Sequence, residues 1–165
     1  MQQKVDETAF FHRSWSEFKE GFGSRDGNFW LGNDEIHRLT KDGGYKLKID
    51  LQQKLSEKWF SVEYDKFVVG DEASNYVLQL GEFSGNISDM FSYSSGYMFS
   101  TYDRNNQPWN NPRYSNSCAI ASQSGWWVRP CWYTFLNGIA RYFYWIGLPG
   151  GQRYLKTSRM SLLCV

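Results

Sequence analysis

Apolar and polar residues alternate along residues 45–51, which read YKLKIDL. Leu47, Ile49 and Leu51 share one face with Tyr45, and the charged residues between them share the other. Because successive side chains of a strand point to opposite faces, this pattern predicts a half-buried β-strand. Residues 59–70 and 74–83 continue in the same style and predict two more strands. The short turns between them favour an antiparallel sheet with one covered face.

Two short helices are predicted on either side of a brief aromatic strand. Residues 9–23 place large apolar side chains at helical spacing and end in glycines, which is typical of a short amphipathic helix. Residues 29–31 predict the strand, and residues 35–39 predict the second helix. Asn33 or Asp34 is expected to cap that helix, because both side chains accept hydrogen bonds from N-terminal amides.

From residue 84 to residue 119 the sequence has almost no periodicity. So long an irregular stretch inside a compact domain is expected only where loops are functional or covalently held. Residues 152–163 regain an apolar pattern and predict a strand that returns to the first sheet. With 165 residues, 41% of them hydrophobic, the chain is long enough for one core, so we treat it as one domain.

Composition excludes several partners. The formal net charge of +1 provides no strong field for nucleic acid. No stretch approaches the ~18 uninterrupted apolar residues that a membrane span requires, and residues 1–10 lack the apolar centre of a signal peptide. Aromatic residues make up 19% of the chain. Large rings fill cores or line binding surfaces, and composition does not choose between these roles.

The three cysteines, Cys118, Cys131 and Cys164, permit one intrachain bond and leave one thiol over. Cys118 and Cys131 stand in a stretch rich in Asn, Ser, Pro and Gly, which is typical of a surface loop. A bond between them would stabilise the fold by roughly 3 kcal/mol. Two reduced thiols in a cytosolic protein are equally compatible with composition. His12 and His37 lie far from the cysteines in sequence, so no zinc site is predicted.

Six motifs occur in a characteristic order: WSEFKEGFG, GNFWLGNDEIHRLT, FSTYDRNN, NSCA, SGWWVRPC and FLNG. Together they resemble fibrinogen-like domains, the C-terminal module shared by fibrinogen chains, ficolins, angiopoietins and tenascins. The resemblance runs from about residue 10 to residue 163. Nothing before residue 10 resembles the N-terminal subdomain of the family, so the chain reads as an N-terminally truncated domain. Gly32, Gly125 and Gly138 within the motifs are expected to be turn positions that need backbone freedom.

The resemblance implies an α+β fold, in which a twisted antiparallel sheet is flanked by short helices and joined to a loop-rich, disulfide-stapled binding subdomain. The sheet part is expected over residues 10–83 and 152–165, and the loop-rich part over residues 84–151. The resemblance also implies that Cys118 and Cys131 are bonded and that the protein is extracellular. Asn86 opens an Asn-Ile-Ser triplet, the acceptor pattern for N-glycosylation, in a predicted loop.

Members of the family that bind acetyl groups have a histidine after the second cysteine and a tyrosine shortly after L-N-G. Here these positions hold Trp132 and Ala140. The chain therefore offers flat rings that stack on sugar faces, but lacks the hydrogen bond of the histidine. The ligand-binding residues that the resemblance implies are Trp132, Tyr133, Phe135, Asn137 and Ala140.

Members that bind calcium carry two aspartates two residues apart before the first cysteine, because calcium favours several oxygen ligands with negative charge. In this chain Asp103 is the only carboxylate of that stretch, and Asn105 stands two residues later. Calcium binding at Asp103 and Asn105 is therefore expected to be weak or absent. No other cofactor is expected.

The sequence has no nucleophile elbow, phosphate-binding glycine loop or metal-hydrolase spacing, so we do not expect an enzyme. The leading hypothesis is a secreted recognition module that binds a carbohydrate or an extracellular protein through residues 89–140. A second hypothesis is a structural role within an oligomer or larger assembly, with Cys164 as a crosslink. A third is a receptor ligand of the angiopoietin-like type.

Overall fold

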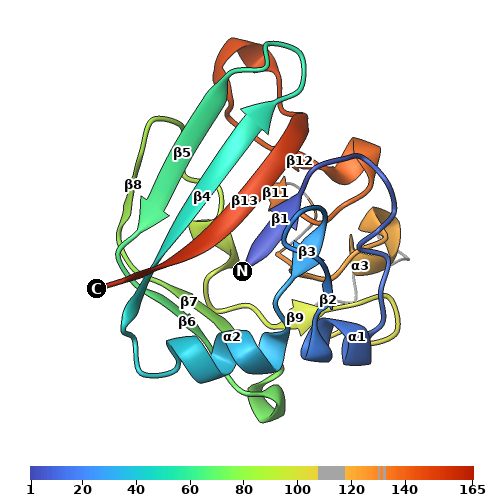
Figure 1. The fold of residues 1–165 in the computed structure, drawn as a ribbon, viewed down its shortest axis with the longest axis vertical. Helices are drawn as coiled ribbons and strands as arrows, with labels where there is room; N and C mark the ends of the chain where they lie inside the picture. The colour runs from blue at the N-terminus through green and yellow to red at the C-terminus, as the bar shows by residue number, and fades with distance from the viewer. Residues whose placement is uncertain (108–117, 130, 132) are drawn as a thin grey trace.

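The computed structural model describes residues 1–107, 118–129, 131 and 133–165. Its main feature is a twisted antiparallel sheet of seven strands, in the order β2-β3-β1-β13-β4-β5-β8 (Figure 1). The strands of this sheet are β1 (Gln2–Lys4), β2 (Phe22–Gly23), β3 (Phe29–Trp30), β4 (Tyr45–Gln53), β5 (Trp59–Tyr64), β8 (Phe83–Gly85) and β13 (Leu155–Cys164). Helices α1 (Trp15–Glu20) and α2 (Asn33–Thr40) lie next to each other at one end of the sheet. This arrangement confirms the predicted fold class.

The rest of the chain forms short paired strands and single turns. The pairs are β6 (Phe67–Val69) with β7 (Leu78–Leu80), β9 (Phe99–Ser100) with β10 (Trp126–Trp127), and β11 (Thr134–Phe135) with β12 (Tyr144–Trp145). Helix α3 (Cys118–Ser122) and the 3-10 turns η1 (Glu72–Ser74), η2 (Ser92–Ser94), η3 (Ala140–Tyr142) and η4 (Pro149–Gly151) connect them. In the described part of the region without periodicity, residues 84–107 and 118–119, the regular elements are short: the end of β8, η2, β9 and the start of α3.

Strand β4 follows the predicted alternation. Leu47, Ile49 and Leu51 are fully buried, whereas the polar residues between them are half-buried on the other face. The closing strand β13 pairs with β4 from Leu155 opposite Gln53 to Cys164 opposite Tyr45, which confirms the strand that was predicted to return to the first sheet.

Of the two segments predicted as single strands, residues 59–70 contain two strands, β5 and β6, and residues 74–83 contain β7 and the first residue of β8. The chain bends at Asp65, whose carboxylate accepts a hydrogen bond of 2.6 Å from the backbone amide of Glu82. After this bend, β6 and β7 leave the main sheet and pair with each other. The alternation of apolar residues breaks at Asp65 and Lys66 and resumes one position out of phase at Phe67, and the prediction of a single strand passed over this break.

Residues 2–4 form strand β1, for which the sequence offered no apolar pattern. This strand lies between β13 and β3, and two of its three side chains are buried. Gln2 donates hydrogen bonds to Asn137 and Ser158. Lys4 donates a hydrogen bond of 3.0 Å to the carbonyl of Thr8. Polar side chains are tolerated in this core strand because they are hydrogen-bonded.

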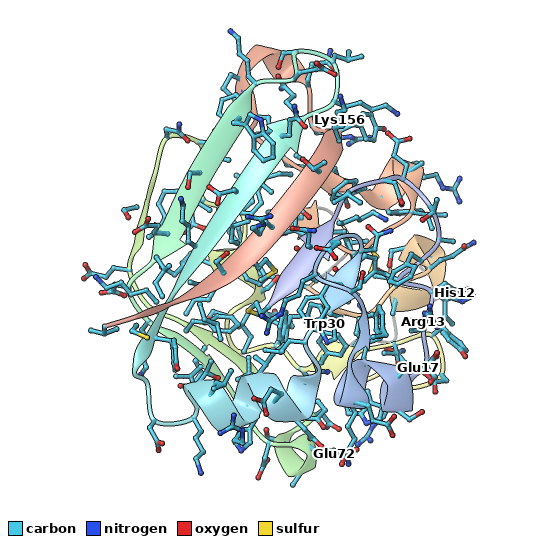
Figure 2. All side chains as sticks on the ribbon, viewed as in Figure 1. His12, Arg13, Glu17, Trp30, Glu72 and Lys156 are labelled. Atoms are coloured by element: carbon cyan, nitrogen blue, oxygen red, sulfur yellow. A yellow bond between two sulfur atoms is a disulfide. The ribbon has the colours of Figure 1, made fainter. Side chains whose placement is uncertain are left out.

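Helix α1 is shorter than the segment predicted for it. The side chain of Ser14 accepts a hydrogen bond from the amide of Glu17, and the carboxylate of Glu17 accepts one from the amide of Ser14. This capping box starts the helix at Trp15 and so excludes Phe11. Glu17 also pairs with Arg13 at 3.0 Å, and Figure 2 shows both residues at the periphery, with Trp30 inside the fold.

Helix α2 begins at Asn33, and the predicted side-chain cap is wrong. The N-cap residue is Gly32, with φ +104°, and no side chain caps the helix. Asn33 is buried and accepts a hydrogen bond of 3.1 Å from the indole of Trp30. Asp34 accepts one of 2.6 Å from the hydroxyl of Tyr76. Both predicted caps therefore serve tertiary contacts instead.

The glycines of the motifs serve two different purposes. Gly32 has the positive φ that favours glycine, as predicted. At Gly125 a Cβ atom would lie 2.6 Å from the ring of Phe18, and at Gly138 it would lie 2.3 Å from the carbonyl oxygen of Tyr142. These two positions need the absence of a side chain, not backbone freedom.

Candidate functional site

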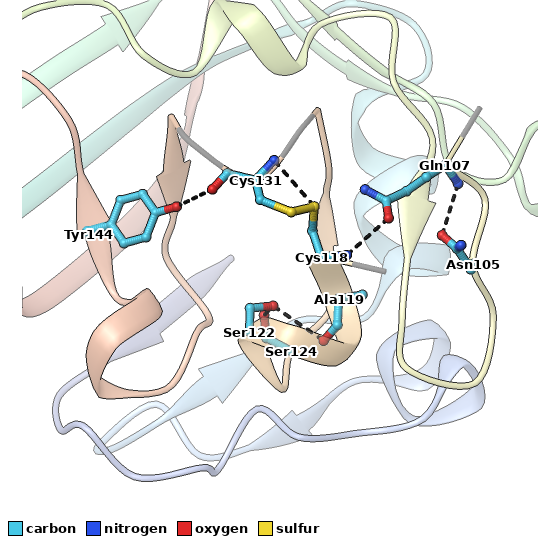
Figure 3. Close-up of a disulfide and its surroundings, with 8 residues drawn as sticks. All are labelled: Asn105, Gln107, Cys118, Ala119, Ser122, Ser124, Cys131 and Tyr144. Carbon is cyan, nitrogen blue, oxygen red and sulfur yellow. Dashed lines mark hydrogen bonds between the residues drawn. A yellow bond between two sulfur atoms is a disulfide. The ribbon is translucent and has the colours of Figure 1, made fainter. Parts of the chain in front are cut away.

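The disulfide of the loop-rich part joins Cys118, at the start of α3, to Cys131, with 5.4 Å between their Cα atoms. This bond confirms the pairing that the resemblance implied. The amide of Cys118 donates to the side-chain oxygen of Gln107 at 3.1 Å, and the hydroxyl of Tyr144 donates to the carbonyl of Cys131 at 2.7 Å (Figure 3). Burial raises the pKa of Tyr144 to about 12, so its phenol remains a donor at neutral pH.

Arg129 and Tyr133, which flank Cys131 in the sequence, form a cluster with Tyr93 and Tyr97 from an earlier segment. The rings of Tyr93 and Tyr133 stack with their centroids 4.2 Å apart and their planes 13° apart. The guanidinium carbon of Arg129 lies 5.5 Å from the ring centroid of Tyr93, 5.8 Å from that of Tyr97 and 5.9 Å from that of Tyr133. We call these four residues the tyrosine–arginine cluster.

This cluster is accessible to a ligand. Tyr93 is 41% exposed, and its three neighbours in the cluster are half-buried. Among the described residues, no carboxylate lies within 4.0 Å of the Arg129 guanidinium. The cluster therefore offers two flat ring faces and a cation whose charge is not neutralised by a neighbouring acid.

Of the five predicted ligand-binding residues, Tyr133 belongs to the cluster and Ala140 is exposed at the start of η3. Phe135 is buried against Tyr142 and Tyr144. Asn137 is also buried; its amide donates to the carbonyl of Gly125 at 3.1 Å. Phe135 and Asn137 thus contact the interior of the protein. Trp132 lies outside the described residues.

Sequence reasoning missed the other three members of the cluster. Tyr93 and Tyr97 stand in the irregular stretch after residue 84, and Arg129 stands inside the motif SGWWVRPC. The only signal in the sequence was the density of tyrosines in a segment without periodicity. That signal does not reveal which rings meet.

The two predicted calcium ligands direct their oxygens at donors of the protein. One carboxylate oxygen of Asp103 accepts hydrogen bonds from the amide of Trp15 at 2.9 Å and from the hydroxyl of Thr101 at 2.7 Å. The side-chain oxygen of Asn105 accepts one from the amide of Gln107 at 3.2 Å. These oxygens are thus already bound to protein donors, and weak or absent calcium binding stays a prediction. The rest of the predicted loop, residues 108–117, lies outside the described residues.

Asn86 follows directly after β8 and is exposed. Its side-chain oxygen accepts a hydrogen bond of 3.1 Å from the amide of Ser61. Since β8 is the edge strand of the sheet, a glycan on Asn86 would stand beside that edge. Glycosylation at Asn86 stays a prediction.

No helix in the described part of the chain is long and apolar enough to cross a membrane. Within the same residues, no three His, Cys, Asp or Glu side chains come together as ligands for a metal ion.

Comparisons with known proteins agree with this geometry. Residues 1–152 match the family described as fibrinogen beta and gamma chains, C-terminal globular domain. Fibrinogen-like protein A of Apostichopus parvimensis is 39% identical over 170 residues, which cover 98% of this chain and 58% of that protein. The chain thus spans little more than half the length of this relative.

Two solved structures share the fold. The fibrinogen-like globe domain of human ANGPTL2 has a TM-score of 0.85 and 32% identity, over 99% of this chain and 78% of that one. A lamprey fibrin D-dimer, complexed with the peptide ligand Gly-His-Arg-Pro-amide, has a TM-score of 0.84 and 27% identity, over 99% of this chain and 60% of that one. The family match begins at residue 1, so the likeness includes strand β1, which sequence reasoning had left out. The chain belongs to the fibrinogen C-terminal globular domain family, because residues 1–152 match that family and the fold and the disulfide agree with the match.

Proposed function

We propose that this chain is an extracellular recognition module, not an enzyme, and that its tyrosine–arginine cluster contacts a carbohydrate or a protein surface. One observation carries the proposal: the guanidinium of Arg129 lies over three tyrosine rings beside the Cys118–Cys131 disulfide. The disulfide supports an extracellular setting, because such bonds persist mainly in oxidising compartments. The lamprey relative, complexed with a short peptide, supports a binding role for the family.

The physical basis is preorganisation of the rings. Stacking of Tyr93 on Tyr133 and the neighbouring guanidinium of Arg129 hold each ring in one orientation before a ligand arrives. A tyrosine offers a large apolar face and a hydroxyl, and it loses little conformational entropy on binding. Arg129 adds a planar donor for carboxylate, sulfate or hydroxyl oxygens. Trp132 and Ala140, the other positions that the resemblance implied, are proposed to contribute to the same binding surface.

The experiment screens the chain on a glycan array and on a panel of extracellular proteins, and then compares variants on the best ligand. Arg129→Ala and Tyr133→Ala are expected to weaken binding at least about tenfold, which corresponds to about 1.4 kcal/mol. Tyr102→Ala is the matched control, because Tyr102 is 42% exposed but pairs with His12 outside the cluster. Trp132→Ala tests the proposed extension.

Equal binding by wild type, Arg129→Ala and Tyr133→Ala would remove the cluster from the site. If Tyr102→Ala weakened binding as much as Arg129→Ala and Tyr133→Ala, the result would point to a surface around His12 instead. Circular dichroism of each variant verifies that the fold is intact.

A second candidate function is assembly with other chains, favoured by the exposed thiol of Cys164 in the last residues of β13. Size-exclusion chromatography with and without reductant distinguishes the two functions. A dimer that dissociates in reductant, and that does not form in Cys164→Ser, would support assembly. A monomer under both conditions would contradict it.

A further inference from the structure

The open face of the main sheet carries a row of polar side chains. Gln3 of β1 pairs with Arg159 of β13, which in turn stands opposite Asp50 of β4. These three residues point away from the core, because their strand neighbours Gln2, Met160 and Ile49 are buried on the other face. The row crosses three adjacent strands of the sheet.

A groove of about 340 Å³ lies along this row. Trp59, at the start of β5, lines it together with Val5, Thr157 and the residues of the polar row. Trp59 is 58% exposed and is the most exposed tryptophan of the described residues. A volume at the lower end of the usual range for small-molecule sites, about 300–1,000 Å³, suits a short oligosaccharide.

The polar groups of the groove are oriented by bonds within the protein. Arg159 donates from Nε and one terminal nitrogen to the side-chain oxygen of Gln3, at 3.0 and 2.7 Å. The amide nitrogen of Gln3 is in turn bound to the carbonyl of Gly27 at 2.8 Å. No described residue accepts a hydrogen bond from the second terminal nitrogen of Arg159, Nη1, so this nitrogen can donate to a ligand from a side chain that is already held in place.

Asp50 supplies the complementary acceptor. One of its oxygens lies 3.4 Å from the ammonium of Lys48, its neighbour two residues before it on β4. The other oxygen has no donor among the residues that the structure describes and can accept hydrogen bonds from hydroxyl groups. Asp50 thus lies between two cations, Lys48 beside it on β4 and Arg159 opposite it on β13. The exposed indole of Trp59 offers an apolar ring face beside these hydrogen-bonding groups, and this combination favours a ligand with apolar ring faces and many hydroxyl groups.

We propose that this groove is a second binding site, independent of the tyrosine–arginine cluster, and that it takes a neutral oligosaccharide. The indole of Trp59 stacks on the apolar face of one sugar ring, while Asp50 accepts hydrogen bonds from sugar hydroxyls and Arg159 donates to them. An exposed aromatic ring beside a few convergent polar groups is the arrangement that fixes such a ligand on a rigid surface. The sheet supplies the rigidity.

The test follows the indole N–H signal of Trp59 in 15N-labelled protein by NMR, assigned by its loss in Trp59→Phe. Three neutral probes are titrated separately: cellotriose, maltotriose and triacetylchitotriose, each to about 10 mM, which detects a Kd of about 1 mM. At least one probe is expected to shift this signal with saturation. Asp50→Ala and Trp59→Ala should weaken that binding at least about tenfold by calorimetry, and Trp59→Phe should restore part of it.

Glu63→Ala is the matched control for Asp50→Ala, because Glu63 lies on the same open face outside the groove. Tyr133→Ala should also leave probe binding unchanged, which separates this site from the proposed function. Failure of all three probes to shift the signal would overturn the proposal, as would equal affinity in Trp59→Ala. A Trp59 signal that shifts with protein concentration, together with a dimer in sedimentation velocity, would assign the groove to a second copy of the chain instead.

Discussion

The carboxylate of Asp103 accepts a hydrogen bond of 2.9 Å from the backbone amide of Trp15, the first residue of α1. The contact ties the loop after β9 to the N-terminus of a helix that is distant in sequence. The first amides of a helix lack partners inside the helix, and a negative charge beside them is favourable. A residue that the sequence suggested as a calcium ligand therefore stabilises a helix end.

Replacement of Asp103 should cost stability with or without calcium. Asp103→Ala is expected to lower the free energy of unfolding by about 1 kcal/mol, the usual loss of a helix-capping acceptor. Asp103→Asn keeps an acceptor oxygen and should recover part of the loss. Urea unfolding in calcium and in chelator measures both. If calcium raised the stability of the wild type alone, the carboxylate would be a calcium ligand.

Loss of the disulfide should destabilise the loop-rich part. The double variant Cys118→Ala/Cys131→Ala is expected to lose roughly 3 kcal/mol in urea unfolding, because the unfolded chain is no longer constrained. Tyr144→Phe removes only the hydrogen bond to the carbonyl of Cys131 and should cost about 1 kcal/mol. Peptide mapping of unreduced protein that finds both thiols free would contradict the assignment of the disulfide.

Stability should rise with pH because of one buried lysine. Burial lowers the pKa of Lys4 from 10.5 to about 8, although Asp6 and Glu7 partly oppose the shift. Between these two values the unfolded chain binds this proton and the folded protein does not, so the free energy of unfolding increases with pH in that window. The stability is fully present above about pH 10.5 and lost as pH falls through about 8.

Lys4→Met keeps an unbranched side chain between Phe11 and Phe143 and removes the titrating group. The variant should lack the rise that urea unfolding detects in the wild type. Tyr64, whose pKa is raised by burial and by its bond to Asp89, gives both proteins the same opposite slope at high pH. Identical pH profiles for the two proteins would show that folding does not lower the pKa of Lys4.

A methyl group at Gly125 should disturb the core. It would press on the ring of Phe18, which is fully buried, so Gly125→Ala is expected to cost about 1–3 kcal/mol by overpacking. Gly44→Ala is the control, because nothing lies within 4 Å of its Cβ position. The two thermal unfolding midpoints should therefore differ clearly, and equal midpoints would contradict the packing argument.

Secretion from eukaryotic cells should place a glycan on Asn86, since its side chain is exposed and opens the acceptor triplet. Mass spectrometry with and without glycosidase should show one modified peptide, absent in Asn86→Gln and in Ser88→Ala. A secreted wild-type protein without any glycan on Asn86 would contradict this prediction. The glycan would also shield the edge strand β8 from pairing with another chain.

Patterns between residues close in the chain predicted much of the fold. Alternation placed Leu47, Ile49 and Leu51 on the buried face of β4, and motif order indicated the family and the bond between Cys118 and Cys131. Such features are visible in the sequence because a strand's period and a motif's spacing depend on neighbouring residues only.

The tyrosine–arginine cluster, the short strand β1 and the partner of Asp103 were decided by tertiary structure. Tyr93 meets Tyr133 and Arg129 only because η2 and the loop after β10 are brought together by the fold. Gln2 became a core residue because it donates hydrogen bonds to Asn137 and Ser158 in distant segments, and Lys4 because it packs between Phe11 and Phe143. Contacts of this kind depend on packing between remote segments, and no local period in the sequence records them.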